Sequence, residues 1–241
     1  MIELRHQDCM EYMRGLPDKA FDLALVDPPY FKGPNERGFY GDRVSSIGVR
    51  RVDYPSTSSW EVPGSEYFAE LIRVSRNQIV WGANHFISAL PINSPAWIVW
   101  DKCNAGSDFA DVELAWTSFG SAARLFAFMW NGMLQGSPED GRKMQGNKAL
   151  NEKRIHPTQK PVALYRWLLQ KYAKPGQRIL DTHLGSGSIA IACDIEGFDL
   201  VGCEIDADYI AGARKRLAEH QAQPRLFVEK REEPQQLRAE L

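Results

Sequence analysis

Residues 178–204 constrain the fold more than any other stretch of this chain. A short apolar strand, Arg178-Ile179-Leu180, leads into a glycine turn that runs from Asp181 to Gly187. A helix of small residues follows and closes at Gly197, because glycine commonly follows the last turn of a helix, and a second strand then ends at Glu204. Strand, glycine turn, helix, strand and acidic residue make up a mononucleotide-binding half of a doubly wound sheet. The predicted fold class is therefore α/β, with a doubly wound, mostly parallel sheet.

The glycine turn also limits the ligand. In dinucleotide-binding turns, glycines admit a pyrophosphate, and an acidic residue about 20 positions further on binds the ribose hydroxyls. The spacing from Gly185 to Glu204 fits this arrangement, but Gly185-Ser186-Gly187 lacks the third glycine of the motif. The missing glycine argues against a pyrophosphate. It favours a ligand with only a nucleoside and an amino-acid portion, such as S-adenosylmethionine, with NAD as the alternative.

Asp27-Pro28-Pro29-Tyr30 marks a second candidate site. It follows the apolar run Phe21–Val26, which has the composition of a buried strand, and the two prolines prevent that strand from continuing. Open α/β sheets place their active sites at the carboxyl ends of strands. A loop stiffened by two prolines can hold a carboxylate, a carbonyl and an aromatic ring in fixed positions, which suits a planar amine. The same four residues can also simply end a strand, so the motif alone does not decide.

Length, charge and cysteine pattern limit the class of protein. At 241 residues, the chain suits one large α/β domain, or one domain with a small insertion. With no run of about 18 apolar residues and no signal-peptide pattern, a cytoplasmic protein without a membrane partner is expected. The four scattered cysteines predict neither a disulfide framework nor a zinc site, and no metal is expected. A formal charge of −2 means that any nucleic-acid surface must be a local basic patch.

Hydrophobic patterning predicts the remaining elements. Strands are expected from residue 2 to about residues 7–9, and at 21–26, 78–81, 97–100, 113–116 and 124–130, and helices at 10–16, from 66 onward, at 85–90, 162–172 and 207–220.

Two polar segments, 31–63 and 131–153, interrupt this pattern and are interpreted as loop insertions for target recognition. The basic residues in or beside them are the candidates for phosphate contacts: Arg50, Arg51, Arg142, Lys143, Lys148, Lys153 and Arg154. Residues 1–228 are predicted to form one domain, with a catalytic half at 1–130 and a cofactor-binding half at 155–220. Residues 229–241 are predicted to be a mobile tail.

The combination of motifs resembles a known family. D-P-P-Y at 27–30, H-P-T-Q-K-P at 156–161, D-x-x-x-G-S-G at 181–187 and the acidic Glu204 are similar to the motifs of the S-adenosylmethionine-dependent DNA amino methyltransferases. The catalytic motif precedes the cofactor motif, as in their circularly permuted β class. The likeness spans roughly residues 1 to 220.

The resemblance implies roles for individual residues. The target base would be handled by Asp27, Pro28, Pro29 and Tyr30. The cofactor would be bound by Asp8, Cys9, Asp27, Lys160, Pro161, Asp181, His183, Gly185, Ser186, Gly187, Glu204 and Ile205. Thr182, His183 and Ser188 depart from the family pattern, which has Pro, Phe and Thr there.

The implied function is methylation of the exocyclic N6 amine of a flipped-out adenine in double-stranded DNA. An N4-cytosine enzyme is the alternative, although such enzymes more often carry serine at the position of Asp27. RNA as the substrate is a weaker alternative. A catalytically silent nucleotide-binding or DNA-binding module is a further alternative. By analogy with the family, a cognate restriction endonuclease and a homodimer are further expectations, and the DNA target sequence stays open.

Overall fold

The computed structural model describes residues 1–30, 60–90, 93–105, 110–130, 134–138 and 151–223. Within this part of the chain, one eight-stranded sheet has the order β1-β10-β9-β2-β3-β5-β4-β6. Its strands are β1 Ile2–His6, β2 Phe21–Val26, β3 Ser75–Trp81, β4 Ile98–Asp101, β5 Val112–Thr117, β6 Arg124–Ala127, β9 Arg178–Asp181 and β10 Asp199–Glu204. The strands from β1 to β3 in this order are parallel, whereas β5 is antiparallel to both of its neighbours. The predicted α/β fold with a mostly parallel sheet is confirmed.

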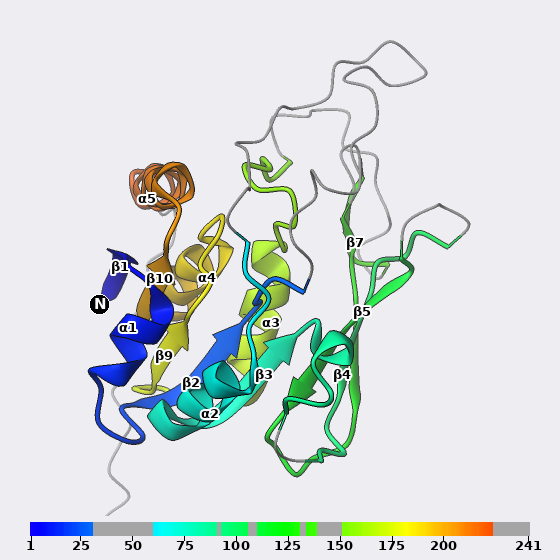
Figure 1. Cartoon of the computed structure of the whole chain (residues 1–241). Helices are drawn as coiled ribbons and strands as arrows, with labels where there is room; N and C mark the ends of the chain where they lie inside the picture. Colours follow the sequence, from blue (N-terminus) through cyan, green and yellow to red (C-terminus); the bar gives the residue numbers. More distant parts are fainter. Residues whose placement is uncertain (31–59, 91–92, 106–109, 131–133, 139–150, 224–241) are drawn as a thin grey trace, which may run out of the picture.

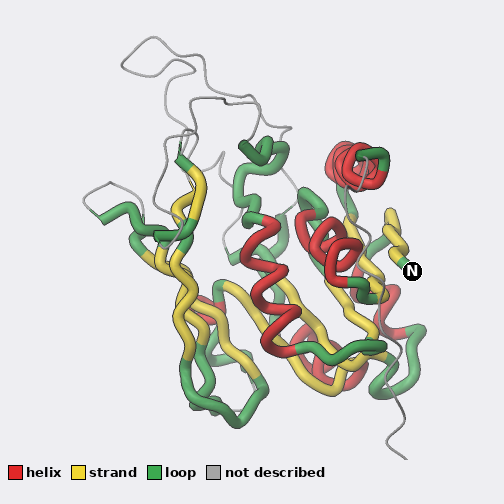
Figure 2. Tube along the Cα trace, turned by 180° about the vertical axis from the view of Figure 1, so that it is seen from behind, coloured by secondary structure: helices red, strands yellow, loops and turns green. Residues whose placement is uncertain are grey.

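Helices cover both faces of the sheet (Figures 1 and 2). They are α1 Cys9–Arg14, α2 Ser65–Val74, α3 Val162–Tyr172, α4 Ser188–Glu196 and α5 Ala207–Gln221. The first two pack on one face, and α3 and α4 pack on the other. Among the described residues, no helix combines the length and the apolar character needed to cross a membrane.

Strand β2 shows why its sequence is apolar without alternation. Leu23 and Leu25 point into the core beneath α3 and α4, whereas Ala24 and Val26 point into the core beneath α1 and α2. All four side chains are buried. Burying a leucine or valine side chain contributes about 1.5–3 kcal/mol, so both cores stabilise this central strand.

The parallel strands bring the two halves of the chain together at one edge. β2 pairs directly with β9, with Leu23 opposite Ile179 and Ala24 opposite Leu180. The segment after β2, which begins at Asp27, therefore lies beside the glycine turn that follows β9. The ends of β1 and β10 reach the same edge, because His6 is opposite Glu204.

Two of the predicted elements need correction. The predicted helix at 85–90 is wrong: a single 3-10 turn, η2 Ala83–His85, follows Gly82 and lacks a side-chain cap. Six residues without a cap are too few to support a helix. The predicted strand at 124–130 is divided, because β7 Met129–Trp130 leaves the main sheet to pair with β8 Gln135–Gly136.

The predicted polar insertions and the predicted tail fall mostly on residues that the structure does not describe. Residues 31–59, 131–133 and 139–150 of the two predicted insertions lie outside the described residues, and so do residues 224–241, which include the predicted tail at 229–241.

Substitution of Gly187 tests the packing of α4 on α5. Gly187 has φ +73°, and a Cβ atom there would lie 2.8 Å from the Cβ of Ala213. Gly187→Ala should therefore lower the free energy of unfolding by about 2–4 kcal/mol, the sum of backbone strain and overpacking, in urea titrations followed by circular dichroism. Gly176 is the matched control, because it has φ +82° but no heavy atom within 4 Å of the position that a Cβ would take. Gly176→Ala should cost only the strain, about 1–2 kcal/mol, and equal losses would contradict the proposed contact.

Candidate active site

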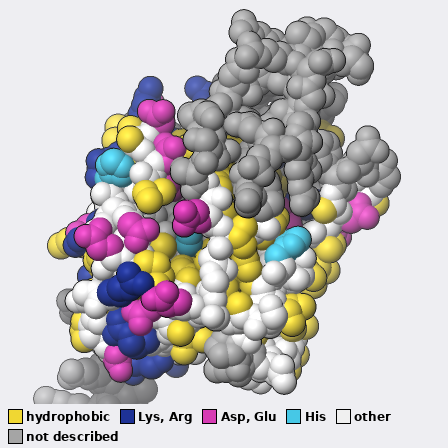
Figure 3. Space-filling view, in the orientation of Figure 1, with side chains coloured by type: hydrophobic (Ala, Val, Ile, Leu, Met, Phe, Trp, Pro, Cys, Tyr) yellow, Lys and Arg dark blue, Asp and Glu magenta, His cyan; other side chains and the backbone are white. Residues whose placement is uncertain are grey.

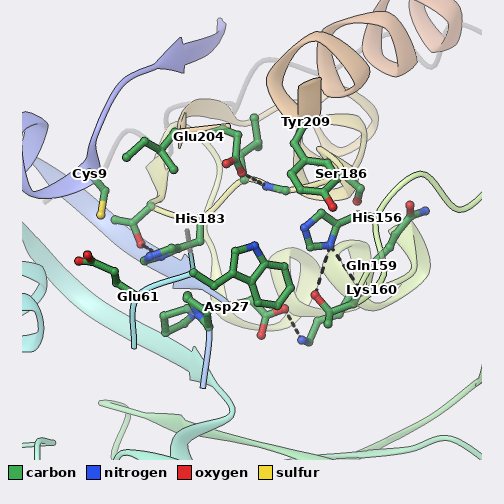
Figure 4. Close-up of a pocket in the computed structure, with 18 of the residues that line it drawn as sticks. Cys9, Asp27, Glu61, His156, Gln159, Lys160, His183, Ser186, Glu204 and Tyr209 are labelled. Carbon is green, nitrogen blue, oxygen red and sulfur yellow. Dashed lines mark hydrogen bonds and ion pairs between the residues drawn. The ribbon is translucent and has the colours of Figure 1, made fainter. Parts of the chain in front are cut away.

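A cavity of about 330 Å³ lies at the carboxyl edge of the sheet. Its walls come from the segments after β1, β2, β9 and β10, from Trp60 and Glu61, and from the turn before α3. Figure 4 shows Glu204, Ser186 and Tyr209 at one end and Asp27 and Lys160 at the other, with His156 and His183 between them. The cavity thus joins the two motifs that the sequence places far apart.

Asp27 has one carboxylate oxygen engaged and one available. Its Oδ2 accepts a hydrogen bond from the Lys160 ammonium. Its Oδ1 is buried, and no hydrogen-bond partner for it exists among the described residues. Burial raises the pKa of Asp27 above its ordinary value, although the charge of Lys160 opposes this shift. A buried acceptor without a partner is costly, which marks Oδ1 as a position for a donor from a ligand.

Lys160 contacts the first residue of the Asp27-Pro28-Pro29-Tyr30 motif. Its side chain is only 3% exposed and pairs with Asp27 and, at 3.2 Å, with Glu113 Oε2. Burial would lower the pKa of Lys160, but the charges of Asp27 and Glu113 raise it above its ordinary value. Lys160 was predicted among the cofactor residues, and it does line the cavity, but its ammonium is directed at Asp27.

The Tyr30 ring packs against His85 and Gly82. It stacks on the His85 ring with centroids 4.5 Å apart and planes 4° apart. Gly82 has φ +67°, and a Cβ atom there would lie 2.5 Å from Tyr30 Cδ1. Glycine is therefore required at this position, and Gly82 and His85 support a ring for which the sequence suggested no neighbours.

The glycine turn is fixed by its own side chains. Asp181 is 1% exposed, and its Oδ1 accepts from the His183 backbone N–H at 3.0 Å. Burial raises the pKa of Asp181 to about 8. The Thr182 hydroxyl bonds to Tyr67 Oη at 2.6 Å and to His183 Nδ1 at 2.9 Å. Burial lowers the pKa of His183 to about 4, so this ring presents a neutral, oriented surface at the cavity wall.

Glu204 and Asp8 provide acceptors at the other end of the cavity. Glu204 Oε2 accepts from the Gly185 N–H at 2.8 Å, and Oε1 accepts from the Asp206 N–H at 2.9 Å. Each carboxylate oxygen can accept more than one hydrogen bond, so Glu204 keeps capacity for ribose hydroxyls. Asp8 caps α1 through a 2.8 Å bond from the Glu11 N–H and also faces the cavity.

His156 forms an aromatic part of the cavity wall. Its ring stacks on Trp60 with centroids 5.5 Å apart and lies 4.3 Å from the Tyr209 ring. Burial lowers the pKa of His156 to about 4, so the ring is neutral near pH 7. The signal was present in H-P-T-Q-K-P, but the partners Trp60 and Tyr209 could not be identified without the fold.

Most predicted site residues meet at this cavity. Those that line it are Asp8, Cys9, Asp27, Pro28, Pro29, Tyr30, Lys160, His183, Gly185, Ser186, Glu204 and Ile205. Pro161, Asp181 and Gly187 do not line it. Pro161 and Gly187 precede the first turns of α3 and α4, and Asp181 is buried behind the turn. Further lining residues were missed: Gln7, Trp60, Glu61, Thr158, Gln159, Thr182, Leu184 and Tyr209.

These residues fit S-adenosylmethionine. Glu204 offers acceptors for a ribose, and the Tyr209 ring and the neutral rings of His156 and His183 offer flat surfaces for a nucleoside. Asp27, whose Oδ1 has no partner among the described residues, lines the same cavity, where a second molecule could place an amine.

Comparison with known proteins gives the same result. The DNA methylase family model for N6 and N4 methyltransferases matches residues 99–215. The type II methyltransferase M.HinfI of Haemophilus influenzae is 24% identical over 246 residues, covering 90% of this chain and 68% of that protein. The type II methyltransferase M2.DpnII of Streptococcus pneumoniae is 25% identical over 243 residues, covering 89% and 88%.

Solved structures share the fold. The complex of M1.HpyAVI with S-adenosylmethionine superimposes with a TM-score of 0.53 at 21% identity, covering 90% of this chain and 100% of that one. The DNA modification methylase TTHA0409 of Thermus thermophilus, also complexed with S-adenosylmethionine, gives 0.54 at 16% identity, covering 91% and 96%. The cytosine-N4-specific PvuII DNA methyltransferase gives 0.56 at 10% identity, covering 91% and 90%. Motifs, fold and relatives agree: the DNA methylase family model matches residues 99–215, and the chain as a whole is similar to type II DNA methyltransferases.

Proposed function

We propose that this protein transfers the methyl group of S-adenosylmethionine to the exocyclic N6 amine of an adenine in double-stranded DNA. The observation that carries the proposal is the Asp27 carboxylate, which has one oxygen bound to Lys160 and the other buried without a partner among the described residues. Asp27 lines the cavity that Glu204 and the glycine turn also line.

Asp27 would make the amine reactive. The lone pair of an exocyclic amine is delocalised into the base and is a poor nucleophile. Asp27 Oδ1 and the Pro28 carbonyl oxygen would each accept a hydrogen bond from one N–H group of the amine. These two bonds would favour a tetrahedral nitrogen, a geometry reached only in the transition state. Bound S-adenosylmethionine supplies an electrophilic methyl group on a sulfonium.

The proton balance follows from this arrangement. The nitrogen lone pair forms the new N–C bond while the electrons of the C–S bond go to sulfur, so the positive charge moves to the nitrogen. One N–H proton must then leave. Asp27 is suited to accept it, because burial raises the pKa of its carboxyl.

Tyr30 would hold the extruded base. Flipping a base out of a duplex costs a few kcal/mol, and stacking on one aromatic ring returns about 1–3 kcal/mol. The ring is braced by His85 and Gly82, so it can stack on a base without first becoming ordered.

Asp27 favours adenine over cytosine. In the resembled family, N4-cytosine enzymes more often have serine at this position, and the PvuII enzyme shows that the fold also serves cytosine-N4 methylation. The type II names of M.HinfI and M2.DpnII support a restriction-modification context. A cognate endonuclease and a homodimer stay predictions.

The contacts to DNA are assigned to the two insertions. The described part of the face in Figure 3 carries both signs of charge. Several surface charges of the described residues are paired, as in Arg14 with Glu66 and Arg73 with Asp18. Of the candidate basic residues, Lys153 and Arg154 are described, and the Arg154 guanidinium is held by the Trp130 carbonyl. Phosphate contacts from the insertions would make DNA affinity fall steeply with salt.

The product identifies the base. Incubation with DNA and isotopically labelled S-adenosylmethionine, followed by nucleoside digestion and mass spectrometry, should yield labelled N6-methyladenine. Labelled N4-methylcytosine would establish the alternative, and the absence of labelled nucleosides would overturn the proposed activity.

Asp27→Asn should lower the rate of methyl transfer at least about 100-fold, because the amide replaces one acceptor by a donor. Calorimetry should show S-adenosylmethionine binding within a few-fold of the wild type. Retained transfer activity would contradict the role of Asp27.

Glu204→Gln should have the opposite pattern. It removes the charge that would accept the ribose hydroxyls, so the Kd for S-adenosylmethionine should rise about tenfold, the effect of weakening one charge-assisted hydrogen bond. Because Glu204 lies at the other end of the cavity from Asp27, transfer at saturating cofactor should stay near the wild-type rate. An unchanged Kd would exclude Glu204 from the cofactor site.

A further inference from the structure

A chain of four charges, of which Lys160 is buried and the other three are half-buried, extends from Asp27 away from the cavity. Lys160 joins Asp27 to Glu113 Oε2, and Glu113 Oε1 pairs with Lys102 at 2.5 Å. Glu113 does not line the cavity, and none of the motifs includes it. Neither the proposed methyl transfer nor cofactor binding explains why a second carboxylate is placed behind the catalytic one.

We propose that Glu113 is a positioning residue that acts through Lys160 on Asp27. It shares the ammonium of Lys160 with Asp27, so that one Asp27 oxygen is fixed while the other stays a strong acceptor for the target amine. This inference rests on the proposed role of Asp27.

The sheet topology places Glu113 at this depth. β5 runs antiparallel to β3, with Ala115 opposite Trp81 at the end of β3. Glu113 precedes Ala115 by two residues, so it extends beyond the end of β3 toward the carboxyl edge of the parallel strands. Its side chain is 22% exposed, and each of its oxygens faces a lysine.

The Lys160 ammonium is enclosed on three sides. Asp27 and Glu113 accept from it, and the buried Trp81 ring lies 5.4 Å from Nζ, in the range of a cation–π contact. Without Glu113, the ammonium could turn further toward Asp27 and engage both of its oxygens. With Glu113 in place, one lysine proton is directed away from Asp27.

Charge leads to the same conclusion. Two carboxylates and two ammonium groups balance along the chain, and burial of an unbalanced charge is strongly unfavourable. Burial would raise the pKa of Glu113, but Lys160 and Lys102 lower it to about 2, so Glu113 stays ionised at working pH. Its negative charge offsets part of the positive charge that Lys160 exerts on Asp27, which keeps Asp27 a stronger hydrogen-bond acceptor.

The other groups that act on Asp27 do not replace this effect. The charged and titratable groups around it are Lys160, Lys102, Glu113, Asp181, Tyr30, Tyr67 and Tyr165. Burial raises the pKa values of the three tyrosines above their ordinary value, so they are neutral near pH 7. Asp181 interacts with Asp27 from the far side, behind the glycine turn, and is bonded to the His183 N–H.

Two variants should shift the pH profile in opposite directions. The acid limb of the transfer rate reports ionisation of Asp27. Lys160→Met removes a cation, so the pKa of Asp27 should rise and the acid limb should move up by about 1–3 pH units. Glu113→Gln removes an anion, so the limb should move down by about one unit, while the plateau rate falls about tenfold because Asp27 becomes a weaker acceptor.

The measurement is single-turnover methyl transfer with saturating S-adenosylmethionine and duplex DNA across pH, with calorimetry of S-adenosylmethionine binding alongside. Lys160→Arg keeps the positive charge, so the acid limb should stay at the same pH even if the rate falls. Glu70→Gln is the matched control, because Glu70 is 21% exposed and paired with Arg73 on α2, away from the cavity. Its pH profile should match the wild type.

Several results would overturn the inference. They are an unchanged pH profile in Glu113→Gln, shifts of both variants in the same direction, or a rate loss without any shift of the acid limb. If Glu113→Gln fails to fold, Lys102→Met provides the second test. It removes the outer cation and should move the limb upward by less than Lys160→Met does.

The inference and the proposed function fail in different ways. A wild-type protein that transfers no methyl group to DNA overturns the function. In that case, ¹³C NMR titration of the Asp27 carboxyl, assigned with Asp27→Asn, still tests the opposite shifts expected in Glu113→Gln and Lys160→Met. Equal Asp27 titrations in all three proteins would overturn the inference alone.

Discussion

The pairing of β2 with β9 is the constraint on which the rest of this molecule depends. β2 lies near the start of the chain and β9 begins at Arg178, yet Leu23 and Ala24 hydrogen-bond in register with Ile179 and Leu180. Because the strands are parallel, the segments that follow them emerge side by side. The loop that begins at Asp27 and the glycine turn, which are separated by more than half the sequence, thus share one cavity. The apolar side chains of β2 on both faces hold this pairing in place.

The buried ion pair between Lys160 and Asp27 adds a second connection between the same two regions. Desolvating two charges is costly, and such pairs are often no more stabilising than apolar residues of similar size. Stability alone is therefore a weak explanation for placing Lys160 at 3% exposure. An explanation from chemistry is stronger, because the charge of Lys160 opposes the rise in the pKa of Asp27 that burial causes, and the pair aligns the carboxylate while one of its oxygens has no partner among the described residues.

Local signals made most of the fold and much of the site predictable. Prolines after an apolar run marked the end of β2, and glycines marked the turn before α4, because both residue types restrict or permit specific backbone conformations. The residues that were missed depend on tertiary pairing. Glu113 reaches the site only because β5 is antiparallel, and Gly82 matters only because the Tyr30 ring lies against it. No pattern along the chain contains this information. The helix expected at 85–90 was predicted from apolar residues that do pack against the core. They do so from a chain of turns, so their burial does not require a helix.

The glycine turn shows how a departure from a family pattern can be compensated. Thr182 and His183 stand where the resembled family has proline and an aromatic residue. A proline restricts the backbone, and here Thr182 instead links Tyr67 to His183 through its hydroxyl. The His183 N–H is held in turn by Asp181. With a pKa lowered to about 4, the His183 ring is neutral and flat, so it can pack against a ligand much as an aromatic ring does. The two departures are therefore coupled: the hydroxyl of one orients the ring of the other, and neither substitution alone would reproduce the surface that both provide.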